Sequence, residues 1–74
     1  MHTVTVYRFN EFGSSMASHR EVSEDDRAAV LEEAVAESER QLGRTRVPYD
    51  DEYIGAGFKV GSGDDANYHV ITCD

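Results

Sequence analysis

The stretch Ser23–Gly43, SEDDRAAVLEEAVAESERQLG, decides the fold, because its periodicity is the clearest in the chain. Apolar or small residues recur in it at alternating steps of three and four, which predicts one buried helical stripe. The stripe consists of Ala28, Leu31, Val35, Ser38 and Leu42, with Ala34 beside it. We therefore expect an amphipathic helix that packs against another layer through this stripe.

Both ends of the predicted helix carry capping residues. Ser23 is the expected N-cap, with Asp26 at the position where a capping box usually has Glu. Glu24, Asp25 and Asp26 would fill the first turn, where the helix dipole favours negative charge. Gly43 can adopt the left-handed conformation that ends many helices.

The segments on either side of the helix have the alternation of β-strands. Thr3–Phe9 (TVTVYRF) has apolar residues on both faces, which suits a central strand. Tyr53–Val60 (YIGAGFKV) and Asn67–Cys73 (NYHVITC) are predicted to form an antiparallel hairpin with a turn at 61–66. Met16–Val22 (MASHREV) is either a weak strand that returns antiparallel to the first or a linker.

The segment 44–52, RTRVPYDDE, is predicted to be a loop, because Pro48 interrupts the pattern and three acidic residues follow. A chain of 74 residues has material for one core, so we expect a single domain over residues 1–74. The predicted class is α+β with the order β-(β)-α-β-β. It combines a small antiparallel sheet with one amphipathic helix packed across one face.

The chain is strongly acidic. It has 15 Asp and Glu against 7 Lys and Arg, which gives a formal net charge of -8. Such a charge repels nucleic acid and anionic lipid, so a basic protein partner is expected, with no direct nucleic acid and no membrane. Lys59 is the only lysine. An acid excess with almost no lysine is also the pattern expected of proteins from a high-salt cytoplasm.

The acids of the predicted helix fall into two rows on its exposed side. One row is Asp25, Glu32 and Glu39, and the other is Asp26, Glu33 and Glu37. Carboxylates four residues apart are separated by a rise of about 6 Å, similar to the spacing of successive phosphates on a nucleic-acid strand. The rows are therefore candidate partner-binding residues for a basic groove built for DNA or RNA. The alternative is a solvated helix face on an acid-rich protein.

A second candidate contact lies in the acidic run between two tyrosines. Its residues are Tyr49, Asp50, Asp51, Glu52 and Tyr53. Aromatic rings beside carboxylates are suited to gripping arginine side chains, so an interaction hot spot is expected here. Antiparallel pairing of the last two strands would bring the run near Asp74 and the terminal carboxylate. Asp64 and Asp65 would then lie at the opposite tip.

The sequence contains no convincing catalytic or metal-binding pattern. A dinucleotide fingerprint needs a helix after its glycines, whereas Gly55 and Gly57 lie inside a predicted strand. They indicate a strip of sheet that another backbone or a partner's side chain approaches closely, or else a bulge or twist. His69 and Cys73 share a strand face, but two ligands do not make a zinc site, and a penultimate cysteine is expected to fray. We expect a non-enzymatic protein with no catalytic residue, no cofactor and no metal.

Cysteine usage and the N-terminus bear on location. Cys73 is the only cysteine, so no intramolecular disulfide is expected. The opening MHTVTVYRFN has neither the basic region nor the apolar run of a signal peptide, and no segment reaches membrane-spanning length. We expect a cytoplasmic monomer or homodimer.

In size, acidity and small α/β layout, the whole chain resembles phage-encoded anti-CRISPR proteins and DNA mimics, without a shared residue motif. The resemblance implies an inhibitor that blocks a basic nucleic-acid-binding surface of a partner through protein–protein interaction. The alternative is a small accessory or regulatory protein of a salt-adapted, haloarchaeal organism, whose halophilic acidity maintains solubility. A dodecin-type flavin binder is disfavoured, because such proteins typically stack the flavin on tryptophan and this chain has none.

Overall fold

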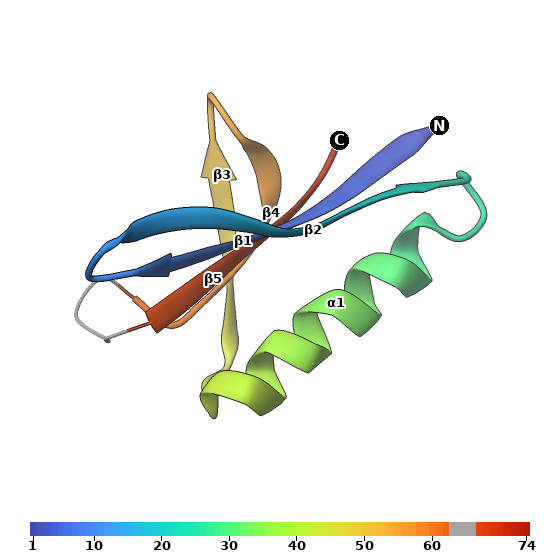
Figure 1. The fold of residues 1–74 in the computed structure, drawn as a ribbon. Coiled ribbons are helices and arrows are strands. Elements are labelled where there is room, and N and C mark those ends of the chain that lie inside the picture. The colour runs from blue at the N-terminus through green and yellow to red at the C-terminus, as the bar shows by residue number, and fades with distance from the viewer. Residues whose placement is uncertain (63–66) are drawn as a thin grey trace.

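The computed structural model describes residues 1–62 and 67–74. Over these residues the chain forms two layers, a five-stranded antiparallel sheet and a helix that lies across one of its faces (Figure 1). The elements are β1 (His2–Asn10), β2 (Gly13–Val22), α1 (Arg27–Leu42), β3 (Arg46–Asp51), β4 (Gly55–Val60) and β5 (Asn67–Cys73). The strand order across the sheet is β2-β1-β5-β4-β3. The predicted α+β class is confirmed.

The N-terminal and C-terminal strands are interior to the sheet. β1 pairs with β2 on one side and with β5 on the other, as expected of a strand with apolar residues on both faces. β4 and β5 form the predicted antiparallel pair. Met16–Val22 belongs to β2, so this segment is a strand and not a linker. Most of the predicted turn at 61–66, with Asp64 and Asp65, falls outside the described residues.

Residues 46–51 form an edge strand, so the loop predicted for them is wrong. β3 pairs with β4 from Arg46 opposite Val60 to Asp51 opposite Gly55. Pro48 is tolerated in β3 because one side of an edge strand makes no ladder hydrogen bonds, so a missing N–H costs little there. A proline in the sequence excludes a central strand but not an edge strand.

The helix begins later than predicted. Asp26 is the N-cap and makes no side-chain capping bond. The Ser23 hydroxyl instead donates to the Asp26 carboxylate at 3.1 Å, and the Asp26 N–H donates to the Ser23 carbonyl at 3.2 Å. These bonds close a turn at 23–26, so Glu24 and Asp25 stand before the helix and not in its first turn. Gly43 ends α1 as predicted, with φ 64°.

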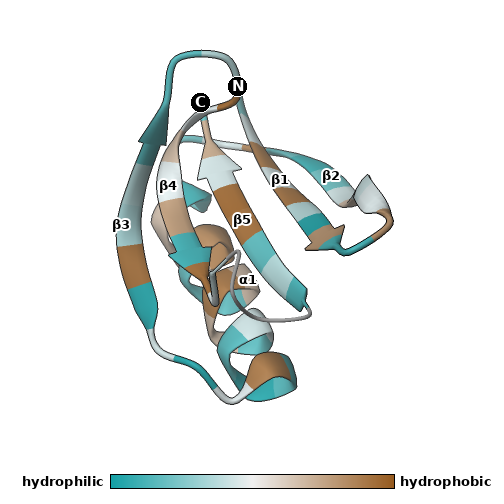
Figure 2. Cartoon of the chain, turned by 90° about the vertical axis from the view of Figure 1, so that its left-hand side faces the viewer, coloured by the Kyte–Doolittle hydropathy of each residue, from teal (hydrophilic) through white to brown (hydrophobic). Residues whose placement is uncertain are grey.

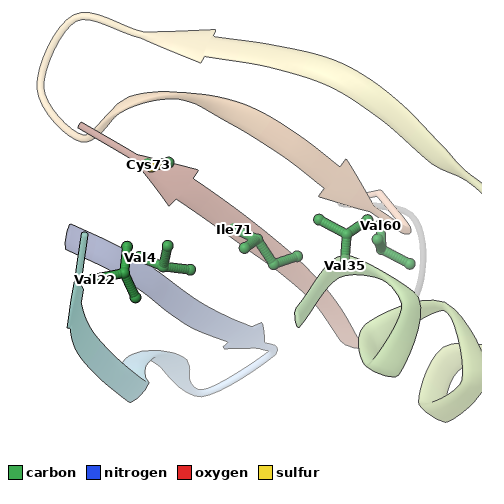
Figure 3. Packing of buried hydrophobic residues seen from close by; sticks show 6 residues of the cluster. All are labelled: Val4, Val22, Val35, Val60, Ile71 and Cys73. Atoms are coloured by element: carbon green, nitrogen blue, oxygen red, sulfur yellow. The ribbon is translucent and has the colours of Figure 1, made fainter. Parts of the chain in front are cut away.

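The core is a thin, valine-rich layer between α1 and the sheet. Its buried members are Val4, Val22, Val35, Val60, Ile71 and Cys73 (Figure 3). On α1, the predicted stripe is correct for Val35 and Ser38, which are buried, and for Leu31, Ala34 and Leu42, which pack against the core. It is wrong for Ala28, which is exposed. Val30 packs against the core instead. The face of α1 that meets the sheet is therefore the predicted one, with Val30 in place of Ala28.

Gly57 marks the closest approach of two backbones in the sheet. A Cβ atom at this position would lie 1.9 Å from the carbonyl oxygen of Ile71 on β5. The backbone that approaches the predicted glycine strip is therefore the protein's own. Gly55 has a positive φ of 99° and open space around it, so its role is the conformation of the β3–β4 turn.

Candidate interaction surface

Two of the three residues in the first acidic row, Glu32 and Glu39, are bonded to one arginine. Arg46, at the start of β3, donates from its Nη2 atom to Oε1 of Glu32 and to Oε1 of Glu39, each at 2.8 Å. Its backbone N–H donates to Oε2 of Glu39 at 2.9 Å. These bonds lower the pKa of both carboxyls and raise the pKa of Arg46. Two members of the row thus hold the fold together instead of facing solvent as free charges.

The second row is also divided. Glu37 forms an ion pair with Arg40 and accepts a hydrogen bond from the Gln41 amide at 3.1 Å, and these contacts lower its pKa. Glu33 is exposed, and its carboxylate makes no hydrogen bond or ion pair with the described residues. Asp26 belongs to the turn before α1. The exposed side of the helix therefore does not carry two continuous rows of free carboxylates.

Carboxylates gather instead at one end of the sheet, which we name the acidic end. It comprises Glu21, Glu24, Asp25, Asp26, Asp50, Asp51, Glu52 and Asp74. The strand register brings the end of β2, the β3–β4 turn and the end of β5 to this side of the molecule. In Figure 1 both termini and the β3–β4 turn lie toward the top of the view, and the end of β2 lies at the right. The expected proximity of the run 50–52 to Asp74 follows from this register.

Some carboxylates of the acidic end organise the local structure. Glu24 pairs with His2, whose Nδ1 donates to the main-chain oxygen of Asp74 at 2.7 Å. The Asp74 side chain accepts the Thr3 N–H at 2.7 Å. Asp51 accepts the Tyr53 N–H at 2.7 Å, which is the main cause of its lowered pKa. These bonds fix the ends of β1 and β5 and the turn after β3.

Other carboxylates of the acidic end face solvent unbonded. Glu21, Asp25, Asp50 and Glu52 are exposed. Within residues 1–62 and 67–74 their carboxylates make no hydrogen bond or ion pair. They are therefore the charges at this end that remain available to an incoming cation.

The sheet face away from α1 carries most of the aromatic side chains, and we name it the aromatic face. It comprises Tyr7, Phe9, Met16, Val47, Tyr49 and Tyr68. Side chains alternate along a strand, so these residues face away from the core residues Val4 and Val60. In Figure 2 α1 lies behind the sheet, and the aromatic face is toward the viewer.

The aromatic face already holds one cation. The Phe9 and Tyr68 rings stack with their centroids 4.7 Å apart and their planes 3° from parallel. The Lys59 ammonium lies 5.0 Å from the ring centroid of Tyr68 and 5.7 Å from that of Tyr49. Met16 and Val47 are more than half exposed beside these rings. The face thus combines apolar contact area with rings that bind a positive charge.

The two tyrosines that flank the acidic run are separated in the structure. Tyr49 is partly buried on the aromatic face, and its hydroxyl donates to Asp51 at 3.3 Å. Burial, with the Asp51 charge, raises the pKa of Tyr49. Tyr53 lies in the β3–β4 turn and is 87% exposed. Tyr53 is therefore an aromatic group of the acidic end, and Tyr49 links that end to the aromatic face.

His69 and Cys73 are held firmly on the core side of β5. His69 is 5% exposed and Ser38 is 3% exposed, and the Ser38 hydroxyl lies 2.8 Å from Nδ1 of His69. Burial lowers the pKa of His69, and the nearby charge of Arg8 lowers it further. Cys73 is buried, and its sulfur accepts a hydrogen bond from Nε of Arg27 at 3.2 Å. The fraying expected at Cys73 is therefore wrong, because the strand pairing continues to this residue.

Among the described residues, His, Cys, Asp and Glu side chains form no group of three or more that could hold a metal ion. The same part of the chain has no helix with the length and apolar character needed to cross a bilayer. No family model, no curated protein and no solved structure matches the chain.

Proposed function

We propose that this protein is a non-enzymatic interaction protein that blocks a basic, nucleic-acid-binding surface of a partner protein. The observation that supports this most is the position of the acidic end beside the aromatic face on one sheet. Unbonded carboxylates attract and orient a cationic surface over distance. Aromatic rings and methionine supply contact area at short range, as they do in known interfaces.

The sheet supports this function better than the helix does. On α1, Glu32, Glu37 and Glu39 are bonded to arginines of the same chain, so a partner would have to displace those bonds. On the aromatic face, Tyr49 and Tyr68 already hold the Lys59 ammonium. An arginine from a basic partner can use the same kind of contact on these rings.

A labelled deca-arginine peptide serves as the probe of a basic surface. We expect saturable binding by fluorescence anisotropy, with an affinity that falls at least about tenfold between about 50 and about 300 mM NaCl. The double variant Asp25→Asn, Glu52→Gln removes two charges from the acidic end. The matched control Glu11→Gln, Glu33→Gln removes two exposed charges elsewhere.

The acidic-end variant should weaken binding by at least about fivefold, and the control by less than about twofold. Salt limits the reach of an exposed charge to about one Debye length, so charges far from the bound peptide contribute little. Equal weakening in both variants would show that only net charge matters and would contradict the assignment. As a second arm, the protein is titrated into a basic DNA-binding protein bound to a labelled duplex. Release of the duplex when this protein is added in an equimolar amount to the DNA-binding protein supports the blocking function. Retention of the duplex contradicts it.

A further inference from the structure

A cleft of about 310 Å³ lies between α1 and the part of the sheet formed by β1 and β2. Val4 and Val6 of β1 give it an apolar floor, and Val30 and Ala34 line it from α1. The cleft is on the helix side of the sheet, so it is separate from the aromatic face. It is also large enough for a small molecule, since ligand sites begin at about 300 Å³.

The charge in this cleft differs from that of the rest of the surface. Arg8, Arg20 and Arg40 line it, and these are three of the 7 Lys and Arg residues in a chain with 15 acids. Arg40 pairs with Glu37, which also lines the cleft, as does Glu33. The side chains of Arg8 and Arg20 make no hydrogen bond or ion pair with the residues that the structure describes. Two guanidinium groups are therefore available to a ligand.

The two available arginines belong to opposite ends of the apolar floor. Arg20 on β2 is the pairing partner of Val4, whereas Arg8 is four residues further along β1. A strand advances about 3.3 Å per residue, so the two backbone positions are offset by about 13 Å along the strand direction and by one strand spacing of about 5 Å across it. The cleft thus presents an apolar strip with a cation at each end.

His69 adds a polar group at the base of the cleft. Its Nδ1 is occupied by the Ser38 hydroxyl at 2.8 Å, which leaves Nε2 as the ring nitrogen for a ligand. Gln41 lines the same cleft from α1 and carries an amide that can donate or accept. These two groups can bind a polar substituent between the cationic ends.

We propose that the cleft binds a small, elongated organic anion whose apolar body rests on Val4 and Val6 and whose terminal oxyanion groups are held by Arg8 and Arg20. Guanidinium groups form paired hydrogen bonds with carboxylate or phosphate oxygens, which gives such contacts both strength and direction. A linear dicarboxylate matches the two-ended arrangement better than a compact anion. This site goes beyond the proposed function and does not depend on it.

The test is a titration of the whole protein, followed through its backbone amide signals by NMR at constant ionic strength. The probes are suberate, hexanoate, inorganic phosphate and hexan-1-ol. Suberate should bind tightest, and hexanoate about tenfold more weakly because it reaches one arginine only. The shifted signals should cluster at β1, β2 and α1. Phosphate lacks the apolar body and hexan-1-ol lacks the charge, so both should bind more weakly still.

The variants Arg8→Gln and Arg20→Gln should each weaken suberate binding at least about tenfold. Arg44→Gln removes the same charge at a position that does not line the cleft. It should weaken suberate binding by less than about twofold. Circular dichroism of each variant checks the fold. No saturable shift with any probe would overturn the proposal. So would phosphate or hexanoate binding as tight as suberate, or an equal loss in Arg44→Gln.

Discussion

Arg46 and Glu39 are joined twice, because the guanidinium Nη2 and the backbone N–H of Arg46 each donate to a carboxylate oxygen of Glu39, at 2.8 and 2.9 Å. The same guanidinium bonds Glu32 and lies 5.5 Å from the ring centroid of Phe58 on β4. Arg46 therefore fastens the edge strand β3 to α1 and to its neighbouring strand. It also removes two carboxylates from the charge that a partner can use.

Replacing Arg46 by glutamine should lower the thermal midpoint by about 5 °C, because β3 loses its side-chain attachment to α1 and the carboxylates of Glu32 and Glu39 lose their shared cation. Thermal melts followed by circular dichroism measure this. Arg40→Gln is the control, since it breaks an exposed pair within one helix and should change the midpoint by less than about 2 °C. Equal effects of the two changes would mean that Arg46 does not hold β3.

Gly57→Ala should destabilise the protein by more than about 3 kcal/mol, because the added methyl meets the Ile71 carbonyl at 1.9 Å and the two strands must separate. Gly43→Ala is the matched change at a site with open space. It should cost about 1 kcal/mol, because its φ of 64° disfavours a side chain. Denaturant unfolding compares the two variants. A smaller loss at position 57 than at position 43 would contradict the close approach of β4 and β5.

The elements with strong local patterns could be predicted from sequence. Alternation identified β1, β4 and β5, and the three–four spacing together with Gly43 identified α1 and its end. β3 could not be identified in this way, because Pro48 and the acidic run interrupt any strand pattern in its own sequence. The segment forms an edge strand because it pairs with β4, and that pairing is visible only in the folded chain. The start of α1 depended on whether Ser23 capped the helix or bonded Asp26, and both are chemically reasonable.

The candidate surfaces required tertiary information to different degrees. Hairpin pairing alone placed the run 50–52 near Asp74, and the register agrees with that placement. The pairing of Glu32 and Glu39 depended on Arg46, which is distant from Glu32 in sequence and reaches it only because β3 is a strand. The cleft beside β2 depends on which strands α1 covers, and residue spacing carries no information about that.

His69 should make stability depend on pH between about 7 and about 5. Its pKa is lowered in the folded state from an ordinary value near 6.5, so the unfolded chain binds a proton that the folded chain excludes. The free energy of unfolding should therefore fall as the pH drops through 6.5. Glu32, Glu37 and Glu39 have lowered pKa values, so their contribution is lost only below their ordinary value of 4.5.

The variant His69→Asn keeps a polar group near Ser38 and removes the titration. Denaturant unfolding at several pH values should show that the fall between pH 7 and pH 5 is largely absent in this variant, while the loss below pH 4.5 remains. Ser38→Ala leaves His69 in place and should retain the dependence. If His69→Asn shows the same dependence as the parent chain, another group is responsible.

The protein should keep its helix and sheet at low salt, despite a net charge of -8. Self-repulsion is limited because Arg46 and Arg40 pair with three helix carboxylates, and most of the other exposed acids are spread over the ends of strands and the turns. Far-ultraviolet circular dichroism should therefore change little between about 0.02 and about 2 M NaCl, a range over which the Debye length falls from above 20 Å to below 3 Å. A cooperative gain of structure as salt rises would instead support the salt-adapted accessory protein, because its acidic surface would need counterions to fold.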